Sequence, residues 1–166
     1  MKLVAFLLLL VPSGAMAQPA PHSLESPVGG GCISSPFGER ATIVVVSIGA
    51  NAGYDIPGSV HSGIDIPAPL GTPIRAVAYG HVVFVGMKGP YGLTVDVEHV
   101  DYVTRYAHLA MVAPDIAMGR KLVGPDTVLG RVGMTGVTTG PHMHFEVRLR
   151  GEAVNPAKYV LVSACR

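Results

Sequence analysis

Glycine and proline interrupt this chain so often that they restrict which regular structure can form. They account for 21 and 14 residues, 35 of the 166 in total, against an average share of about 12%. Helical signals are weak between these interruptions, whereas short runs rich in β-branched residues recur. This pattern predicts an all-β fold, a compact antiparallel β-sandwich or barrel-like domain with little helix. The expected strands are 42–47, 74–78, 81–85, 93–99, 102–108, 127–132 and 142–149, with one helical turn near 155–159.

The last expected strand alternates strictly between polar and apolar residues. Side chains two positions apart lie on the same face of a strand. Its polar face carries His142, His144, Glu146 and Arg148, and its apolar face carries Met143, Phe145, Val147 and Leu149. We expect the apolar face to pack on the core and the polar face to border a groove or solvent.

The N-terminal segment is typical of an export signal. Lys2 precedes the apolar run 4–11, and Ala15-Met16-Ala17 follows as an A-x-A cleavage site. The run is shorter than the roughly 20 apolar residues of a membrane span. We therefore expect a signal peptide at 1–17, a Pro-, Ser- and Gly-rich linker at 18–30, and one domain at 31–166. The protein is then exported to the periplasm or cell envelope and is not membrane-bound after signal removal.

The charge balance excludes two classes of partner. Lys and Arg total 12 and Asp and Glu total 11, so loss of Lys2 leaves 11 of each and a net charge of zero with histidine neutral. No basic run or patch is visible. Binding to nucleic acid or to an anionic membrane surface has no electrostatic basis here. We expect a monomer.

The two cysteines, Cys32 and Cys165, bracket the whole expected domain. An oxidising compartment permits a disulfide between them, and closing so long a loop would stabilise the folded chain by roughly 5 kcal/mol. Two separate thiols are the alternative. A zinc-binding role is not expected, because neither cysteine has a ligand-type residue nearby.

Three histidine segments carry the chemistry. In HSGID, His61 and Asp65 are too far apart to share a metal if the chain is extended, so we expect a bend at Ser62-Gly63. In PHMHFE, His142 and His144 project to one face of a strand after the turn TGVTTG. In RYAHLA, His108 ends a strand.

Each of these segments alone has an ordinary structural explanation as a loop, edge or surface histidine. Together, His61, Asp65 and one of the pair His142 and His144 make the three-ligand set of a catalytic zinc site with an open position for water. Zinc lowers the pKa of such a water toward about 7. The remaining histidines can handle protons, since the ordinary pKa of histidine is near 6.5.

The segments SPFGER, HSGIDIPAPLGTPIRA, RYAHLA and GMTGVTTGPHMHFEVR resemble the lysostaphin/LytM-type zinc endopeptidases of peptidoglycan. The resemblance runs from about residue 35 to 159. It implies that His61, Asp65 and His144 bind one Zn²⁺, and that His108 and His142 are the catalytic pair that does not bind metal. It also implies a β-fold with a groove across the sheet.

The resemblance makes hydrolysis of peptide stems or cross-bridges of peptidoglycan the expected activity. One alternative is a catalytically silent LytM-type binding module that activates other cell-wall hydrolases. A second is a structural, disulfide-bridged wall-binding domain, which leaves the five polar site residues unexplained.

Other residues receive weaker assignments. We expect His99 to be a buried, hydrogen-bonded histidine, with orientation of a catalytic group as the alternative, and His22 and His81 to be structural or solvated. Possible groove residues are Arg40, Tyr54 and Tyr91. Residues 41–60 lack a His-Pro stretch that is common in the family, which leaves the groove wall and substrate preference undefined.

Overall fold

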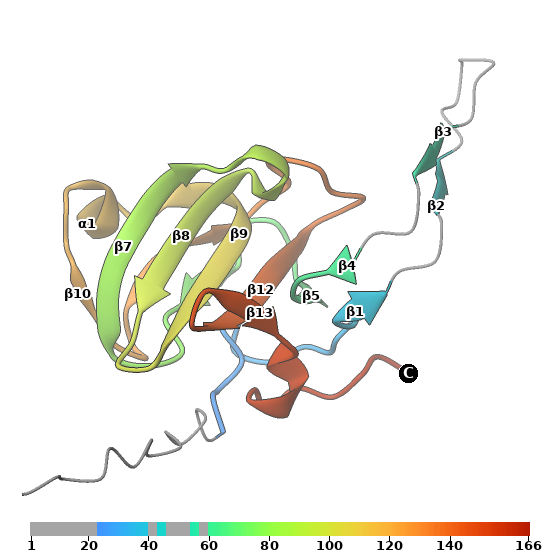
Figure 1. The fold of residues 1–166 in the computed structure, drawn as a ribbon. Helices are drawn as coiled ribbons and strands as arrows, with labels where there is room; N and C mark the ends of the chain where they lie inside the picture. The colour runs from blue at the N-terminus through green and yellow to red at the C-terminus, as the bar shows by residue number, and fades with distance from the viewer. Residues whose placement is uncertain (1–22, 40–42, 46–53, 57–59) are drawn as a thin grey trace, which may run out of the picture.

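The computed structural model describes residues 23–39, 43–45, 54–56 and 60–166, so the expected signal peptide lies outside the described residues. The described chain is mostly strand (Figure 1), which confirms the all-β prediction. The strands are β1 (Gly38–Glu39), β2 (Ile43–Val45), β3 (Tyr54–Ile56), β4 (Val60–His61), β5 (Ile64–Pro67), β6 (Pro73–Arg75), β7 (Gly80–Met87), β8 (Leu93–Glu98), β9 (Tyr102–Val112), β10 (Leu122–Val123), β11 (Val128–Val132), β12 (His142–Leu149) and β13 (Glu152–Val154).

Three short helical segments interrupt the strands. They are η1 (Gly89–Tyr91), α1 (Pro114–Ala117) and η2 (Pro156–Lys158), and η2 is the helical turn expected near 155–159. Each begins with proline at its first or second position, where the missing N–H costs nothing. None of the helices in the described ranges has the length and apolarity needed to cross a bilayer.

A nine-stranded sheet organises the domain. Its main path runs β10-β7-β8-β9-β11-β6, and β12 pairs with β9, β5 and β13. The strands β7, β8 and β9 form an antiparallel meander that is visibly curved in Figure 1. The long strand β9 pairs with β12 as far as Ala107 and with β11 from Leu109 onward, so the pairing changes at His108.

The core lies on the apolar face of β12, as the alternation predicts. Met143, Phe145 and Val147 are completely buried and pack with apolar residues of β8 and β9. Burial of side chains of this size contributes roughly 1.5–3 kcal/mol each. The expectation for the opposite face is wrong at Glu146, which is also 0% exposed instead of bordering a groove or solvent. Its carboxylate is covered because Arg105 and Arg148 both donate to it.

The described part of the expected linker packs against the domain. Leu24 is buried in the core, forms a parallel bridge with Val160, and donates its N–H to the carbonyl of Tyr159. Further on, Ile33 bridges to Ala164 in the same way. The beginning and end of the described domain therefore lie side by side.

The predicted bridge between the termini is present. Cys32 and Cys165 form a disulfide with a Cα–Cα distance of 4.9 Å across a sequence separation of 133. The two cysteines are the chain neighbours of Ile33 and Ala164, so the disulfide lies next to that β-bridge.

We expect the double variant Cys32→Ser/Cys165→Ser to be less stable by about 2–5 kcal/mol, because opening so long a loop restores conformational entropy to the unfolded chain. Denaturant unfolding of the oxidised protein and the variant measures this difference. None of the expected site residues is a cysteine, so the expected peptidase activity should persist at low temperature. Equal unfolding midpoints would contradict the prediction.

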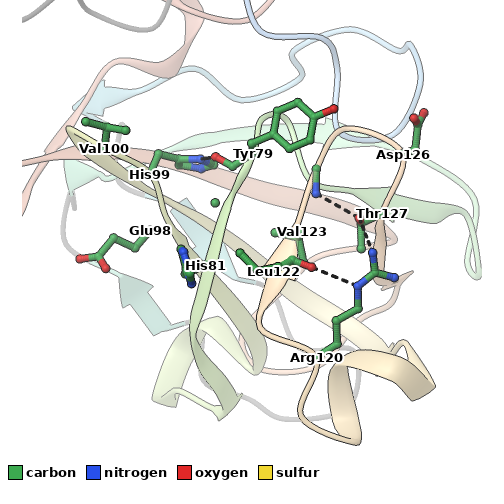
Figure 2. A pocket seen from close by; sticks show the side chains of 12 residues that line it. Tyr79, His81, Glu98, His99, Val100, Arg120, Leu122, Val123, Asp126 and Thr127 are labelled. Carbon is green, nitrogen blue, oxygen red and sulfur yellow. Dashed lines mark hydrogen bonds between the residues drawn. The ribbon is translucent and has the colours of Figure 1, made fainter.

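His81 and His99 lie where β7 begins and β8 ends. Figure 2 shows His81 and His99 beside a pocket between β7, β8 and β10. His99 donates from Nδ1 to the carbonyl of Tyr79, and its Nε2 lies 2.9 Å from Thr104 Oγ1. Burial lowers its pKa, so the ring is held neutral. His99 is therefore the buried, hydrogen-bonded histidine that we expected, and its ring also stacks on Tyr102.

Candidate metal centre

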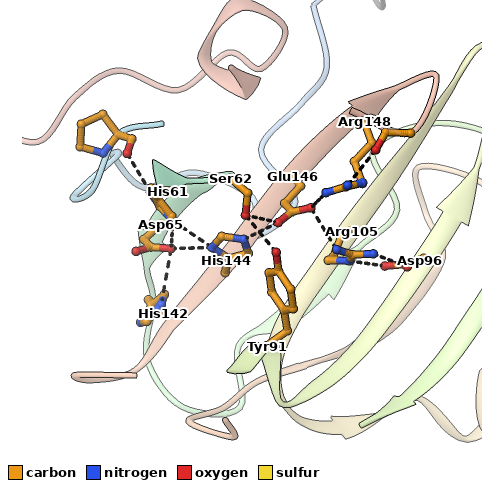
Figure 3. Close-up of polar contacts among 12 residues, drawn as sticks. His61, Ser62, Asp65, Tyr91, Asp96, Arg105, His142, His144, Glu146 and Arg148 are labelled. Carbon is orange, nitrogen blue, oxygen red and sulfur yellow. Dashed lines mark hydrogen bonds and ion pairs between the residues drawn. The ribbon is translucent and has the colours of Figure 1, made fainter. Parts of the chain in front are cut away.

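Three residues from two distant parts of the sequence converge at the end of the sheet where β12 pairs with β5 (Figure 3). His61 Nε2 lies 3.2 Å from Asp65 Oδ1 and 3.0 Å from His144 Nδ1, and His144 Nδ1 lies 3.0 Å from Asp65 Oδ1. All three side chains are buried. The structure thus brings together His61, Asp65 and His144, as the resemblance implied, although His61 and His144 are 83 residues apart.

This triangle has the dimensions of a metal site. Two ligands about 2.0 Å from a tetrahedral zinc ion are about 3.3 Å apart, close to the three distances above. Among the described residues, His61, Asp65 and His144 form a cluster of metal-ligand side chains whose donor atoms lie close enough together to hold one metal ion. A single ion at its centre can contact all three donor atoms.

The hydrogen bonds on the outer side of each ring direct a lone pair to the centre. His61 Nδ1 is 2.7 Å from the carbonyl oxygen of Pro36. A carbonyl only accepts, so this nitrogen carries the proton and Nε2 is left as an acceptor. His144 Nε2 is 3.2 Å from a carboxylate oxygen of Glu146, which leaves His144 Nδ1 as an acceptor. Together with Asp65, three acceptors face one point, an arrangement that needs a cation.

The electrostatics of the site also favour positive charge at that point. Burial alone would raise the pKa of Asp65, but its hydrogen bonds with His144 and His61 outweigh burial and hold that pKa well below its ordinary value. Burial alone would lower the pKa of His144, but the Asp65 and Glu146 carboxylates outweigh it and raise that pKa. A proton and a metal cation would compete for this position.

The local chain path explains how His61 and Asp65 meet. His61 ends β4, Ile64 begins β5, and the chain bends at Gly63 as predicted. A Cβ at Gly63 would lie 2.4 Å from the Phe145 carbonyl oxygen and 2.8 Å from His144 Cε1. Only glycine permits this approach, which places β5 directly against the ligand-bearing part of β12.

The two remaining histidines stand beside the triangle. The rings of His108 and His142 meet edge to face with centroids 4.9 Å apart, and the His108 centroid is 5.8 Å from that of His144. His142 Nε2 lies 3.6 Å from Asp65 Oδ1, farther than the three triangle distances. The structure therefore brings both predicted catalytic histidines to the site but outside the donor triangle.

The turn at residues 135–140 orients both of these rings. His108 Nδ1 donates to the carbonyl of Thr135, and His142 Nδ1 donates to the carbonyl of Gly140. In both rings Nδ1 therefore carries a proton, because a carbonyl oxygen can only accept. Burial lowers the pKa of His108, which keeps the ring neutral near neutral pH. The Gly/Thr turn that precedes the His-x-His sequence is thus the element that fixes both tautomers.

Backbone geometry directs His108 into the site. Its φ is +60°, a left-handed conformation that a non-glycine residue adopts at a cost. The register between β8 and β9 shifts across this position, since Leu93 pairs with Leu109 but Val95 pairs with Tyr106. Such irregularities re-aim side chains and occur often beside active sites. No sequence pattern marked this bulge.

A groove borders the triangle on the side of β1. Its volume is about 710 Å³, and its lining includes Ser35, Glu39, Asp65, Gly140 and His142. This size lies within the usual range of about 300–1,000 Å³ for ligand sites. A triangle residue, Asp65, and a candidate catalytic residue, His142, therefore lie in the wall of this groove.

The structure places the residues with weaker assignments in different parts of the chain. Tyr91 lies at the site, with its ring centroid 5.4 Å from that of His144 and its hydroxyl 3.0 Å from Ser62 Oγ. Arg40 and His22 lie outside the described residues, as do most residues of 41–60. Tyr54 lies in β3, which pairs with β2. His81 is exposed on β7, as expected.

The sequence profile of peptidase family M23 matches residues 59–156. This range includes the three triangle residues and the two histidines beside them, which are His61, Asp65, His144, His108 and His142. The chain belongs to peptidase family M23. This confirms the resemblance drawn from the sequence motifs.

Two relatives of this chain carry peptidase names. The chain is 42% identical over 130 residues to the DD-carboxypeptidase/endopeptidase Mpg of Neisseria meningitidis, a match covering 78% of this chain and 27% of that protein. It is 39% identical over 100 residues to the peptidoglycan DD-endopeptidase ShyA of Vibrio cholerae, covering 59% of this chain and 22% of that protein. The chain thus spans about a quarter of the length of these relatives.

A solved structure shares the fold. The crystal structure of a zinc-containing peptidase from Vibrio cholerae superposes with a TM-score of 0.54 at 27% identity, covering 75% of this chain and 39% of that one. The fold similarity to this peptidase therefore covers three quarters of the chain.

Proposed function

We propose that this protein is an exported zinc-dependent endopeptidase that hydrolyses peptide cross-links in bacterial peptidoglycan. The observation that carries the proposal is the buried triangle of acceptors from His61, Asp65 and His144, with His108 and His142 beside it and a groove along it. Membership of family M23 and the names of the relatives support the substrate class.

Zinc is the ion that best fits this donor set. Two imidazoles and one carboxylate in a nearly equilateral triangle match a three-ligand catalytic zinc site. When bound, zinc polarises the scissile carbonyl and lowers the pKa of a water molecule at its open position. We assign the ligand roles to His61 Nε2, Asp65 Oδ1 and His144 Nδ1.

The catalytic pair is positioned to accept protons. Because Nδ1 of His108 and of His142 is held by a carbonyl, each ring offers only its Nε2 lone pair. Two such acceptors can hold both hydrogens of one attacking water molecule. We assign His142 as the general base that later returns the proton to the leaving amine, and His108 as the group that orients the water. A neutral His108 in this tautomer has no N–H to offer an oxyanion.

Digestion of isolated peptidoglycan tests the proposal. Purified protein is incubated with cross-linked muropeptide dimers, with and without a chelator, and the products are identified by mass. We expect cleavage of a peptide bond within the cross-linked stems, and we expect the chelator to stop it. Absence of cleavage by metal-loaded protein would overturn the proposal and favour the binding-module alternative.

A further inference from the structure

A second buried carboxylate lies directly behind the donor triangle. Glu146 is two residues beyond His144 on β12 and is 0% exposed. Its Oε1 lies 3.2 Å from His144 Nε2, on the side of the ring that faces away from Asp65. Figure 3 shows the imidazole of His144 between the two carboxylates.

The Glu146 carboxylate has donors on both of its oxygens. Oε1 accepts from His144 Nε2 and from Ser62 Oγ at 2.5 Å. Oε2 accepts from Arg105 at 3.2 Å and from Arg148 at 2.7 Å. Because four donors fix this group, it cannot rotate, and it can only accept from His144.

A row of paired charges anchors this carboxylate to the sheet. Glu146 and Arg105 are cross-strand partners between β12 and β9, and Arg105 and Asp96 are partners between β9 and β8. Arg105 holds Asp96 through two contacts of 2.9 Å, and Lys88 adds a third donor to Asp96 at 3.1 Å. Only the Glu146 end of the row touches His144.

We propose that Glu146 is a positioning residue that fixes the tautomer and orientation of His144 and thereby sets the zinc affinity of the site. As long as Nε2 donates to Glu146, Nδ1 stays a lone pair directed at the triangle. The inference rests on the zinc site proposed above. Groups that orient a metal-bound histidine in this way typically change metal affinity by about 10–100-fold when mutated.

Glu146→Gln tests the inference with little change in shape. An amide has one acceptor oxygen where the carboxylate has two. Either the donors on Oε1 or the donors on Oε2 would therefore face the amide N–H group and lose their acceptor. We expect the dissociation constant for zinc, measured by competition with a chromophoric chelator, to rise by about 10–100-fold. Asp96→Asn is the matched control, because it also breaks a buried ion pair with Arg105 but leaves the contact with His144.

The control separates positioning from structural support. Thermal unfolding should show that both variants lose stability, while only Glu146→Gln loses zinc affinity. Equal zinc affinity in Glu146→Gln and the wild type would overturn the inference, as would an equal loss of affinity in both variants. If the wild type binds no zinc, the proposed function fails instead, so the two failures are distinguishable.

Nuclear magnetic resonance of the zinc-loaded wild type gives a test that does not depend on the folding of a variant. Histidine labelled with ¹⁵N reports which ring nitrogen carries a proton. We expect His144 to show a protonated Nε2 and a metal-bound Nδ1. The opposite pattern, with Nε2 on the metal, would show that Glu146 does not hold the ring as proposed.

Discussion

The variant His144→Ala is expected to lose both bound zinc and peptidase activity. His144 supplies one of the three donors of the triangle, and its ring separates two carboxylates that would otherwise remain close together without a shared partner. Two remaining ligands hold zinc poorly, and without the metal the attacking water is not activated. Zinc content after dialysis and cleavage of muropeptide dimers measure the two losses.

His81→Ala is the matched control for this variant. His81 is an exposed strand histidine on β7, in the region shown in Figure 2 rather than at the metal centre. This control should keep full zinc occupancy and full activity. Circular dichroism of His144→Ala shows whether the fold survives. Full zinc occupancy in a folded His144→Ala protein would contradict the ligand assignment.

The variant His142→Ala is expected to keep its zinc and to lose about 10²–10⁴-fold in turnover, the usual contribution of a positioned proton-transfer group. Its Nε2 lies outside the donor triangle, 3.6 Å from Asp65 Oδ1. Its Nδ1 is engaged by the turn at Gly140, so Nε2 is left to accept a proton.

Zinc analysis and turnover on the same preparation of His142→Ala separate two roles. Retained zinc with lost turnover supports proton transfer. Loss of zinc would make His142 a ligand, and wild-type turnover with zinc present would show that it takes no part in the reaction. Both of these results contradict the assignment.

The local elements were predictable because they depend on short-range patterns. The strict alternation in 142–149 predicts both the strand and the apolar face that forms the core. The bend at Gly63 follows from the need to bring His61 and Asp65 to one ion. The disulfide follows from two cysteines that bracket a domain expected to be exported. Each inference needs only residue types and their spacing.

The less predictable features depend on pairing between distant strands. The positive φ of His108 arises where the partners of β9 change, and no pattern in residues 102–112 indicates that change. The burial of Glu146 depends on Arg105, which lies on another strand 41 residues away. The i, i+2 spacing of His144 and Glu146 was the available signal, but it identifies a shared face and not what covers that face.

The strand β5 was missed for a related reason. Ile64–Pro67 holds four residues, and it is not among the strands expected from the sequence. They form a strand because β12 offers them a partner, with Asp65 opposite His144 and Ile64 opposite Phe145. Tertiary pairing therefore decides the conformation of a segment too short to show a pattern of its own.

Titration of metal-free protein with zinc shows whether one bound metal ion per chain switches on peptide cleavage. Each addition is followed by the rate at which a muropeptide dimer is cleaved, with the products identified by mass. The geometry of one donor triangle predicts that the rate rises linearly to one zinc per chain and then stays constant. Cleavage by the metal-free protein, or a rate that stays at background after one equivalent of bound zinc, would contradict the account.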